Sequence, residues 1–227
     1  MEIAEIWRYP VKSMAGEQLR SANLGVRGLT GDRGIATFDR QSRRPDHPVS
    51  ARGLPGLLRF RAVCAADGAV VTGPDLPPTP WRHPAVANRL REVCQRPLEL
   101  AEVVGGAFDD SPLHLVLLPS VIGVAAAVNR HVDPRRFRAN LFIAADPGQV
   151  DAERGWLGAH LHIGAAVVRV LSECARCVVT TRDPDTYAGW PGLLRHLVET
   201  RQAMMGVYAE VVVPGRIAPG SPVVVES

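Results

Sequence analysis

Glycine and proline divide this chain into short segments, and this limits the folds that it can adopt. The 227 residues include 21 glycines and 19 prolines, whereas only 5% are aromatic. Glycine permits tight turns, and proline interrupts helices and strands. The mixture therefore favours many short strands over a helical bundle. With 46% hydrophobic and 22% charged residues, the chain can bury a substantial core as one compact unit or as two small packed lobes.

Most apolar residues occur in short runs that predict strands. Such runs lie near residues 3–9, 35–38, 98–104, 113–118, 140–145, 161–171, 178–181, 207–213 and 222–226. Residues 59–64 and 69–72 fit a hairpin around Asp67-Gly68. The glycine-rich segment 24–34 and the proline-rich segment 74–80 are expected to be irregular.

Three segments instead have the spacing of amphipathic helices. The first begins near Pro84 and reaches Cys94, which falls on its apolar face. The second runs from Ser120, the expected N-cap, to about Arg130. The third covers residues 193–198. We therefore predict an α+β, mostly β protein, a closed or half-closed barrel with a few peripheral helices.

Composition and charge argue against several classes of protein. The first five residues contain two acids and lead into no apolar signal region, and no apolar run is long enough to span a bilayer. The net charge is +3, and no basic run is interleaved with aromatic residues. We expect a cytoplasmic protein that binds neither membranes nor nucleic acid.

The segment Cys174-Ala175-Arg176-Cys177 is the sharpest local signal for chemistry. A redox dithiol normally opens a helix, but Val178–Thr181 looks extended. A structural zinc site needs a second pair of ligands, which Cys64 and Cys94 do not form. Two readings remain: one activated thiolate with the other cysteine as a packing neighbour, or two buried thiols. Arg176 favours the thiolate, because a nearby guanidinium lowers the pKa of a thiol.

Basic residues gather at two places that suit an anion. Arg135, Arg136 and Arg138 precede an apolar strand, so they need an anion, acidic partners or a solvated edge. Asn140 follows them and offers amide groups to a heterocycle. Near the N-terminus, Lys12, the only lysine in the sequence, precedes a glycine-rich loop that contains Gly31-Asp32-Arg33. Glycine lets backbone N–H groups approach an anion closely.

Two further motifs have simpler explanations. Asp109-Asp110-Ser111-Pro112 fits a turn better than a metal-binding acid pair. His160 and His162 share one strand face, and without an acid or cysteine in the motif we expect surface or packing roles.

Taken in order, the motifs resemble the MOSC family, in particular the branch of the mitochondrial amidoxime-reducing component and its bacterial relatives. The matching segments are Tyr9–Ser13, Gly28–Arg33, Asp110–Pro112, Arg136–Asn140, Trp156–Gly158, Leu161–Gly164, Cys174–Cys177 with Thr180-Thr181, Asp183–Thr186 and Gly220–Val223. They span nearly the whole chain. Each motif alone is common, whereas this order is highly specific.

The resemblance implies a fold, a cofactor and a set of contacts. It implies a β-rich N-terminal domain over residues 1–100, packed on a MOSC β-barrel over residues 101–227, with a molybdenum–pterin cofactor in the cleft between them. Cys177 would be the molybdenum ligand and the catalytic residue, and Cys174 would not be a ligand. The implied cofactor-binding residues are Lys12, Ser13, Arg33, Asp110, Ser111, Arg136, Arg138, Asn140, Ala175, Arg176, Cys177 and Tyr208.

The resemblance also implies an activity and partners. It implies a molybdenum-dependent oxidoreductase that reduces amidoximes, hydroxylamines and N-hydroxylated bases. Four cysteines leave no iron–sulfur site, so electrons would come from a separate protein of the ferredoxin or flavin reductase type. The alternatives are a non-redox sulfur-transfer or cofactor-carrier protein that uses Cys177, and a plain binding barrel. The chain departs from its relatives at Gly34, Ala139 and Tyr187, and these changes concern the substrate mouth.

Overall fold

The chain folds into two compact units in the computed structural model, which describes residues 1–226. The large unit contains residues 1–7, 18–30 and the described residues from Asp110 onward, and the small unit contains residues 8–17 and 31–109. Both units thus take segments from the first hundred residues. The predicted domain division at residue 100 stays a prediction, and Ser227 lies outside the described residues.

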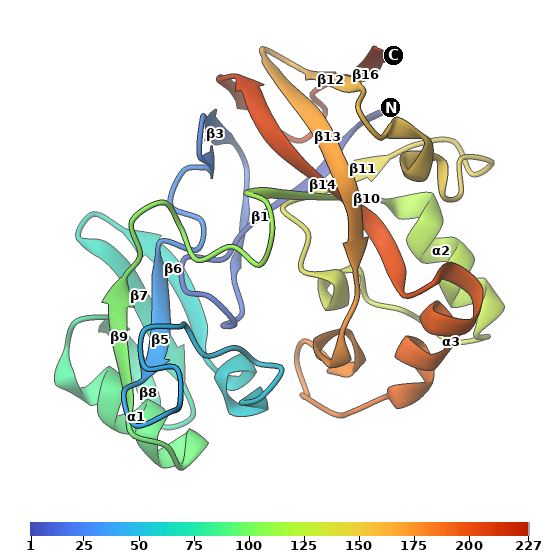
Figure 1. Ribbon diagram of the computed structural model, residues 1–227. Helices are drawn as coiled ribbons and strands as arrows, with labels where there is room; N and C mark the ends of the chain where they lie inside the picture. The colour runs from blue at the N-terminus through green and yellow to red at the C-terminus, as the bar shows by residue number, and fades with distance from the viewer. Residues whose placement is uncertain (227) are drawn as a thin grey trace. The chain divides into compact units, whose positions relative to one another are not determined.

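A single sheet of mixed strands forms the frame of the large unit (Figure 1). In spatial order it contains β16 (Val223–Glu226), β12 (His160–Ile163), β13 (Ala166–Ala175), β14 (Met204–Val213), β10 (Leu113–Leu117), β11 (Leu141–Ala144), β1 (Glu2–Arg8) and β2 (Glu17–Leu19). A smaller sheet joins β15 (Gly215–Ile217), β3 (Ala22–Gly25) and β4 (Gly28–Leu29). Strands β10 and β11 run parallel, so a crossover must join them.

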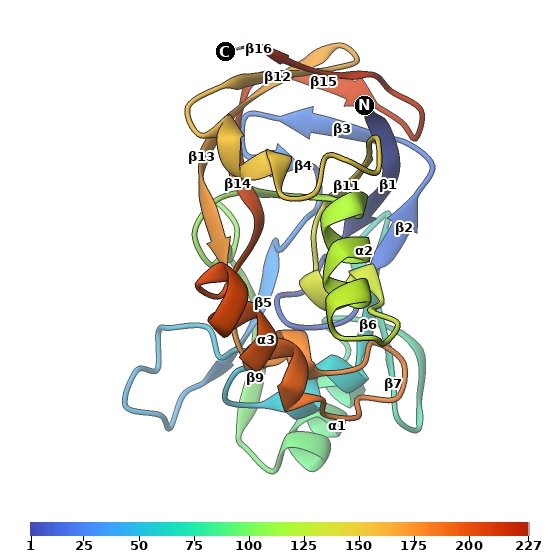
Figure 2. The ribbon, with the colours of Figure 1, turned by 90° about the vertical axis from the view of Figure 1, so that its right-hand side faces the viewer.

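Helix α2 (Leu118–Ala127) makes that crossover, and helix α3 (Pro191–Arg201) packs beside it (Figures 1 and 2). Four short 3₁₀ helices are also described: η1 (Pro55–Arg59), η2 (Pro134–Phe137), η3 (Ala152–Trp156) and η4 (Val178–Thr181). The two helices and η2 share a buried apolar cluster that includes Val124, Phe137 and Leu197. A separate apolar core fills the space inside the main sheet and includes Ile6, Leu115 and Val168.

The small unit is built from short antiparallel strands and one helix. Strand β5 (Ile35–Asp39) pairs with β9 (Leu98–Glu102), and β6 (Arg61–Ala65), β7 (Gly68–Gly73) and β8 (Leu76–Pro80) form a second sheet. Helix α1 (Pro84–Cys94) covers an apolar core that contains Phe60, Val71 and Leu90. The mostly β, α+β fold class predicted from the sequence is confirmed. None of the helices in residues 1–226 is long and apolar enough to cross a membrane.

Several local predictions are confirmed. The hairpin predicted around Asp67-Gly68 is present, and its turn residues are Ala66 and Asp67, between the paired Ala65 and Gly68. Helix α1 begins at Pro84, as expected from the missing N–H of proline. Cys94 is half-buried against the core of the small unit. All three predicted helices are present, as α1, α2 and α3, and local pattern predicts them and the hairpin because local residues determine these elements.

Other local predictions are wrong. The single strand expected over residues 161–171 is the hairpin β12–β13, because Gly164 has a left-handed φ of 57° and turns the chain. Residues 178–181 are the 3₁₀ helix η4, in which the Thr181 hydroxyl donates to the Val178 carbonyl over 2.7 Å. Segment 76–80 is strand β8, whose prolines are tolerated because it is an edge strand.

Ser120 is not the N-cap of α2. Leu117 holds that position, and the Ser120 hydroxyl donates instead to Glu153 Oε2 over 2.8 Å. The same hydroxyl oxygen accepts from the Asp151 N–H over 2.9 Å. Glu153 is only 1% exposed, and in the described part of the chain its Oε1 has no hydrogen-bond partner. Burial therefore raises the pKa of Glu153.

We expect Glu153→Gln to stabilise the protein at neutral pH. When folding raises the pKa of a carboxyl group, that group contributes stability at pH values below its unfolded-state pKa, near 4.5. This contribution is lost as the pH rises through the folded-state pKa. Glutamine keeps an acceptor for Ser120 without the buried charge. Melting scans should show a Tm about 2–4 °C higher than wild type at pH 7 and no gain at pH 4. An equal gain at both pH values would contradict the titration argument.

Candidate functional site

Strand β13 ends where the two cysteines of the Cys174–Cys177 segment diverge. Cys174 is buried at 1% exposure, whereas Cys177 is half-buried and directly precedes η4. The Cys177 carbonyl accepts from the Thr180 N–H over 3.0 Å, which starts the 3₁₀ turn. Within residues 1–226 no hydrogen bond or ion pair engages the Cys177 thiol. That thiol is therefore available to a ligand, and the Cys174 thiol is not.

Arg176 lies between the two cysteines and is held at three points. Its backbone N–H donates to the Ala203 carbonyl over 2.7 Å. One guanidinium nitrogen donates to Cys174 Sγ over 2.8 Å, and the other donates to the Phe137 carbonyl over 2.8 Å. The pKa-lowering effect that the sequence suggested for Arg176 is thus directed at Cys174.

Two residues from neighbouring strands complete the surroundings of the Cys174 sulfur. His114 on β10 and Tyr208 on β14 are paired in register, and their ring centroids are 5.5 Å apart. Burial raises the pKa of Cys174, but the charges of His114 and Arg176 and hydrogen bonds from His114 and Tyr208 lower it to about 6. His114 was not among the predicted site residues, although a histidine inside the apolar run Leu113–Leu117 is a usable signal.

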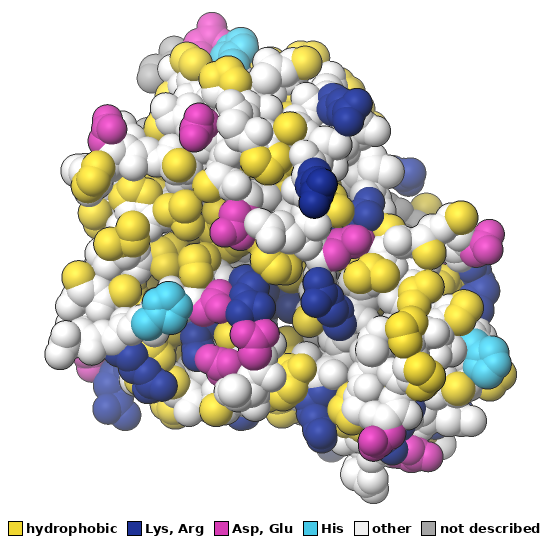
Figure 3. Space-filling model, turned by 180° about the vertical axis from the view of Figure 1, so that it is seen from behind, with side chains coloured by type: hydrophobic (Ala, Val, Ile, Leu, Met, Phe, Trp, Pro, Cys, Tyr) yellow, Lys and Arg dark blue, Asp and Glu magenta, His cyan; other side chains and the backbone are white. Residues whose placement is uncertain are grey.

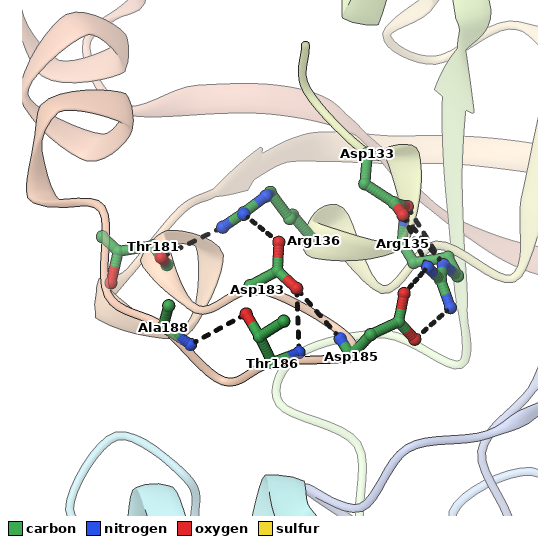
Figure 4. A network of polar contacts seen from close by, with 8 residues as sticks. All are labelled: Asp133, Arg135, Arg136, Thr181, Asp183, Asp185, Thr186 and Ala188. Atoms are coloured by element: carbon green, nitrogen blue, oxygen red, sulfur yellow. Dashed lines mark hydrogen bonds and ion pairs between the residues drawn. The ribbon is translucent and has the colours of Figure 1, made fainter. Parts of the chain in front are cut away.

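The arginines before β11 mostly have acidic partners (Figure 4). Arg135 pairs with Asp133 and Asp185. Arg136 is buried and donates to Asp183 over 2.6 Å and to the Thr181 carbonyl over 3.0 Å. The sequence left open an anion, acidic partners or a solvated edge for these arginines, and Arg135 and Arg136 both have acidic partners. A cofactor role for Arg136 stays a prediction.

Arg138 and Asn140 follow on the same segment. Arg138 has a left-handed φ of 53° at the end of η2 and is half-buried. Asn140 is fully buried, accepts from the His114 N–H over 3.2 Å and donates to the Trp7 carbonyl over 3.2 Å. Its amide therefore ties together β10 and the end of β1, and its predicted role as a cofactor contact stays a prediction.

Asp110 and Ser111 lie just before β10. Asp110 is exposed and accepts from the Ser172 hydroxyl over 3.3 Å, while Ser111 is half-buried. Ser172 is opposite Tyr208 in the register of β13 and β14. Ala175, the last residue of β13, is exposed. The large unit thus brings nine of the predicted residues onto neighbouring segments, and their roles as contacts stay predictions.

The remaining predicted residues belong to the small unit. Lys12 Nζ donates to the Ala107 carbonyl over 2.8 Å and to Asp109 Oδ1 over 2.6 Å. Arg33 pairs with Asp32, and its guanidinium lies 5.0 Å from the ring centroid of Tyr9.

The backbone around these cations is unusual. Ser13 has a left-handed φ of 69°, and its hydroxyl accepts from the Ala51 N–H over 3.0 Å.

Burial raises the pKa of Asp109, but Lys12, Arg52 and Arg33 together bring it below its usual value. Cations therefore gather around one carboxylate, and Arg52 is a member that the sequence analysis missed.

Acidic and basic side chains lie interspersed on the face drawn in Figure 3. In residues 1–226 no cluster of three or more His, Cys, Asp or Glu side chains is arranged to hold a metal ion.

The fold and these residues define a β-rich protein in which the half-buried Cys177 follows β13 and the buried Arg136 is bound to the next turn, η4. The chain matches the MOSC N-terminal beta barrel domain over residues 1–101 and the MOSC domain over residues 101–224. It therefore belongs to the MOSC family, which confirms the family predicted from the motifs. This family is associated with molybdenum cofactor binding.

Individual relatives are distant. Human mitochondrial amidoxime-reducing component 1 is 24% identical over 231 residues, which cover 81% of this chain and 67% of that protein. The crystal structure of the YUAD protein from Bacillus subtilis matches with a TM-score of 0.57 at 14% identity, over 100% of this chain and 95% of that one. YiiM from Geobacillus stearothermophilus matches with a TM-score of 0.42 at 21% identity, over 54% of this chain and 57% of its own. The likeness to the Bacillus subtilis structure shows the fold alone.

Proposed function

We propose that this protein is a molybdenum cofactor-dependent oxidoreductase that uses two electrons and two protons to remove the oxygen of N-hydroxylated compounds as water, which leaves the corresponding amidine, amine or base. Its substrates would be amidoximes, hydroxylamines or N-hydroxylated bases, and a separate ferredoxin or flavin reductase would supply electrons. The observation that carries the proposal is the half-buried Cys177 thiol, unpartnered within residues 1–226, at the end of β13. Membership of the MOSC family and the distant similarity to the amidoxime-reducing component support it.

The residues around Cys177 fit such a cofactor. A soft thiolate suits molybdenum that is otherwise held by a dithiolene. Arg136 Nε, Arg176 Nε and Thr180 Oγ1 are buried polar atoms that have no hydrogen-bond partner in the described residues. Two of these residues, Arg176 and Thr180, lie within three positions of Cys177 in the sequence. When bound, the cofactor supplies a redox-active metal that takes up single electrons and delivers two to an N–O bond.

The chain itself supplies binding and orientation. Cys177 provides the thiolate ligand, and η4 fixes its backbone through the bond from the Thr180 N–H. Arg136 keeps a buried positive charge close to η4, held by Asp183 and the Thr181 carbonyl. Contacts of Lys12 and Arg33 with the cofactor phosphate stay predictions.

Metal and pterin analysis of Cys177→Ser tests this proposal. In a cofactor-competent host, we expect wild type to hold nearly stoichiometric molybdenum and pterin and Cys177→Ser to lose most of the metal. Cys94→Ser is the matched control, because Cys94 is also half-buried but lies in the small unit.

The outcomes separate the alternatives. Wild type without pterin would overturn the cofactor proposal, and wild type with pterin but little metal would favour a carrier. Metal-loaded wild type that cannot reduce an aromatic amidoxime with a reduced viologen dye would overturn the activity. Reduction by wild type and not by Cys177→Ser supports it.

A further inference from the structure

A buried cysteine that the proposed function does not use lies in a strongly polar environment. Cys174 is 1% exposed, yet its sulfur meets Arg176 at 2.8 Å and interacts with the side chains of His114 and Tyr208. These groups come from β10, from β14 and from the end of β13. A cysteine that served only to fill a core would be expected to have apolar neighbours.

The donors around this sulfur favour its anionic form. A guanidinium group can only donate hydrogen bonds, so the Arg176 contact requires the sulfur to accept. A neutral thiol is a weak acceptor, whereas a thiolate accepts strongly from a cation. Burial raises the pKa of Cys174, but the His114 and Arg176 charges and the Tyr208 hydroxyl bring it down to about 6. Glu173, the adjacent acid, pairs with Arg154.

Arg176 connects this sulfur to the proposed metal ligand, because it binds Cys174 and directly precedes Cys177. Its guanidinium bridges Cys174 Sγ and the Phe137 carbonyl, and its backbone N–H is bound to Ala203. Cys177 is the next residue along the chain. When both ends of Arg176 are fixed, the peptide that leads into Cys177 has little freedom to rotate.

We propose that Cys174 is a thiolate in the folded protein and acts as a positioning residue, which holds Arg176 and thereby the turn that presents Cys177. The ionised state of Cys174 does not depend on a bound cofactor. Its effect on metal binding rests on the proposed function of Cys177 as the ligand.

Thiolate absorbance at 240 nm tests the anionic state in cofactor-free protein. The Cys177→Ser variant removes the other thiol of the segment, and burial raises the pKa of both Cys64 and Cys94, so these ionise at higher pH. We expect Cys177→Ser to show one thiolate that titrates near pH 6, and Cys174→Ala/Cys177→Ser to lose it. No thiolate signal below pH 8 in Cys177→Ser would overturn the proposal, even if the double variant does not fold.

Charge-retaining and neutral replacements test the positioning role. Cys174→Ser keeps the size of the side chain without the charge, and Cys174→Asp restores an anion for Arg176. We expect Cys174→Ser to lower molybdenum retention about tenfold, as loss of a residue that orients a ligand does, and Cys174→Asp to recover much of it. Retention that is equal to wild type in Cys174→Ser would overturn the positioning role.

The two proposals fail differently. Wild type without molybdenum would overturn the proposed function and leave the thiolate titration valid. A normal metal content in wild type with no thiolate signal would overturn only the role of Cys174. Cys94→Ser, which changes a half-buried cysteine of the small unit, serves as the control and should retain wild-type metal content.

Discussion

Replacing Gly206 with alanine is expected to remove about 3–5 kcal/mol of folding stability, a large part of the total for a domain of this size. Gly206 lies in β14 with a left-handed φ of 75°, which L-residues other than glycine adopt only at a cost. An added Cβ would lie 2.4 Å from the Leu115 carbonyl oxygen and 2.7 Å from His114 Nε2. The Leu115 backbone belongs to β10, which pairs on both sides, so it has no room to move away.

Gly220→Ala separates the two causes of this loss. Gly220 has a similar φ of 83°, but nothing lies within 4 Å of the position that its Cβ would take. The Gly220→Ala substitution should therefore lower folding stability only by the backbone strain, about 1 kcal/mol. Urea denaturation of both variants makes the comparison. Equal losses in the two variants would show that the close approach to β10 has no energetic consequence.

Gly206 also shows what local sequence cannot predict. A strand was expected over residues 207–213, and β14 begins three residues earlier, at Met204. The need for glycine at position 206 arises from irregular pairing with β13. The register of these strands shifts between Glu173 and Ala175, next to the cysteine segment. Such a bulge depends on two strands that are distant in sequence, so the apolar periodicity of either strand does not predict it.

The same limit applies to the candidate site. The Cys174–Cys177 motif was visible because its residues are contiguous. His114 joins it only because β10 pairs with β14. In the same way, Asp183 meets Arg136 across 47 positions of sequence, so the sequence left open whether the arginines bind an anion or acids. Residue types and order predicted the family, whereas the partner of each charge required the tertiary structure.

Asp183→Asn is expected to destabilise the protein by about 2–3 kcal/mol, because it leaves the buried Arg136 guanidinium without its carboxylate. Asparagine can still accept from the Thr186 and Asp185 N–H groups, so the loop 183–188 keeps its turn and the change isolates the charge (Figure 4). Asp185→Asn is the matched control in the same loop. Asp185 is 68% exposed and pairs with the less buried Arg135, so its loss should cost at most about 1 kcal/mol.

The pH dependence of the Asp183→Asn effect provides a second check on the pair of Asp183 with Arg136. The backbone N–H of Thr186, followed by other hydrogen bonds and the charge of Arg136, lowers the pKa of Asp183. When folding lowers the pKa of a carboxylate, that group contributes stability at pH values above its unfolded-state pKa, near 3.8. This contribution is lost as the pH falls through the folded-state pKa. Urea denaturation should therefore show a large difference between wild type and Asp183→Asn at pH 7 that shrinks below about pH 4. A difference that is constant with pH would mean that the asparagine alters the loop rather than the charge.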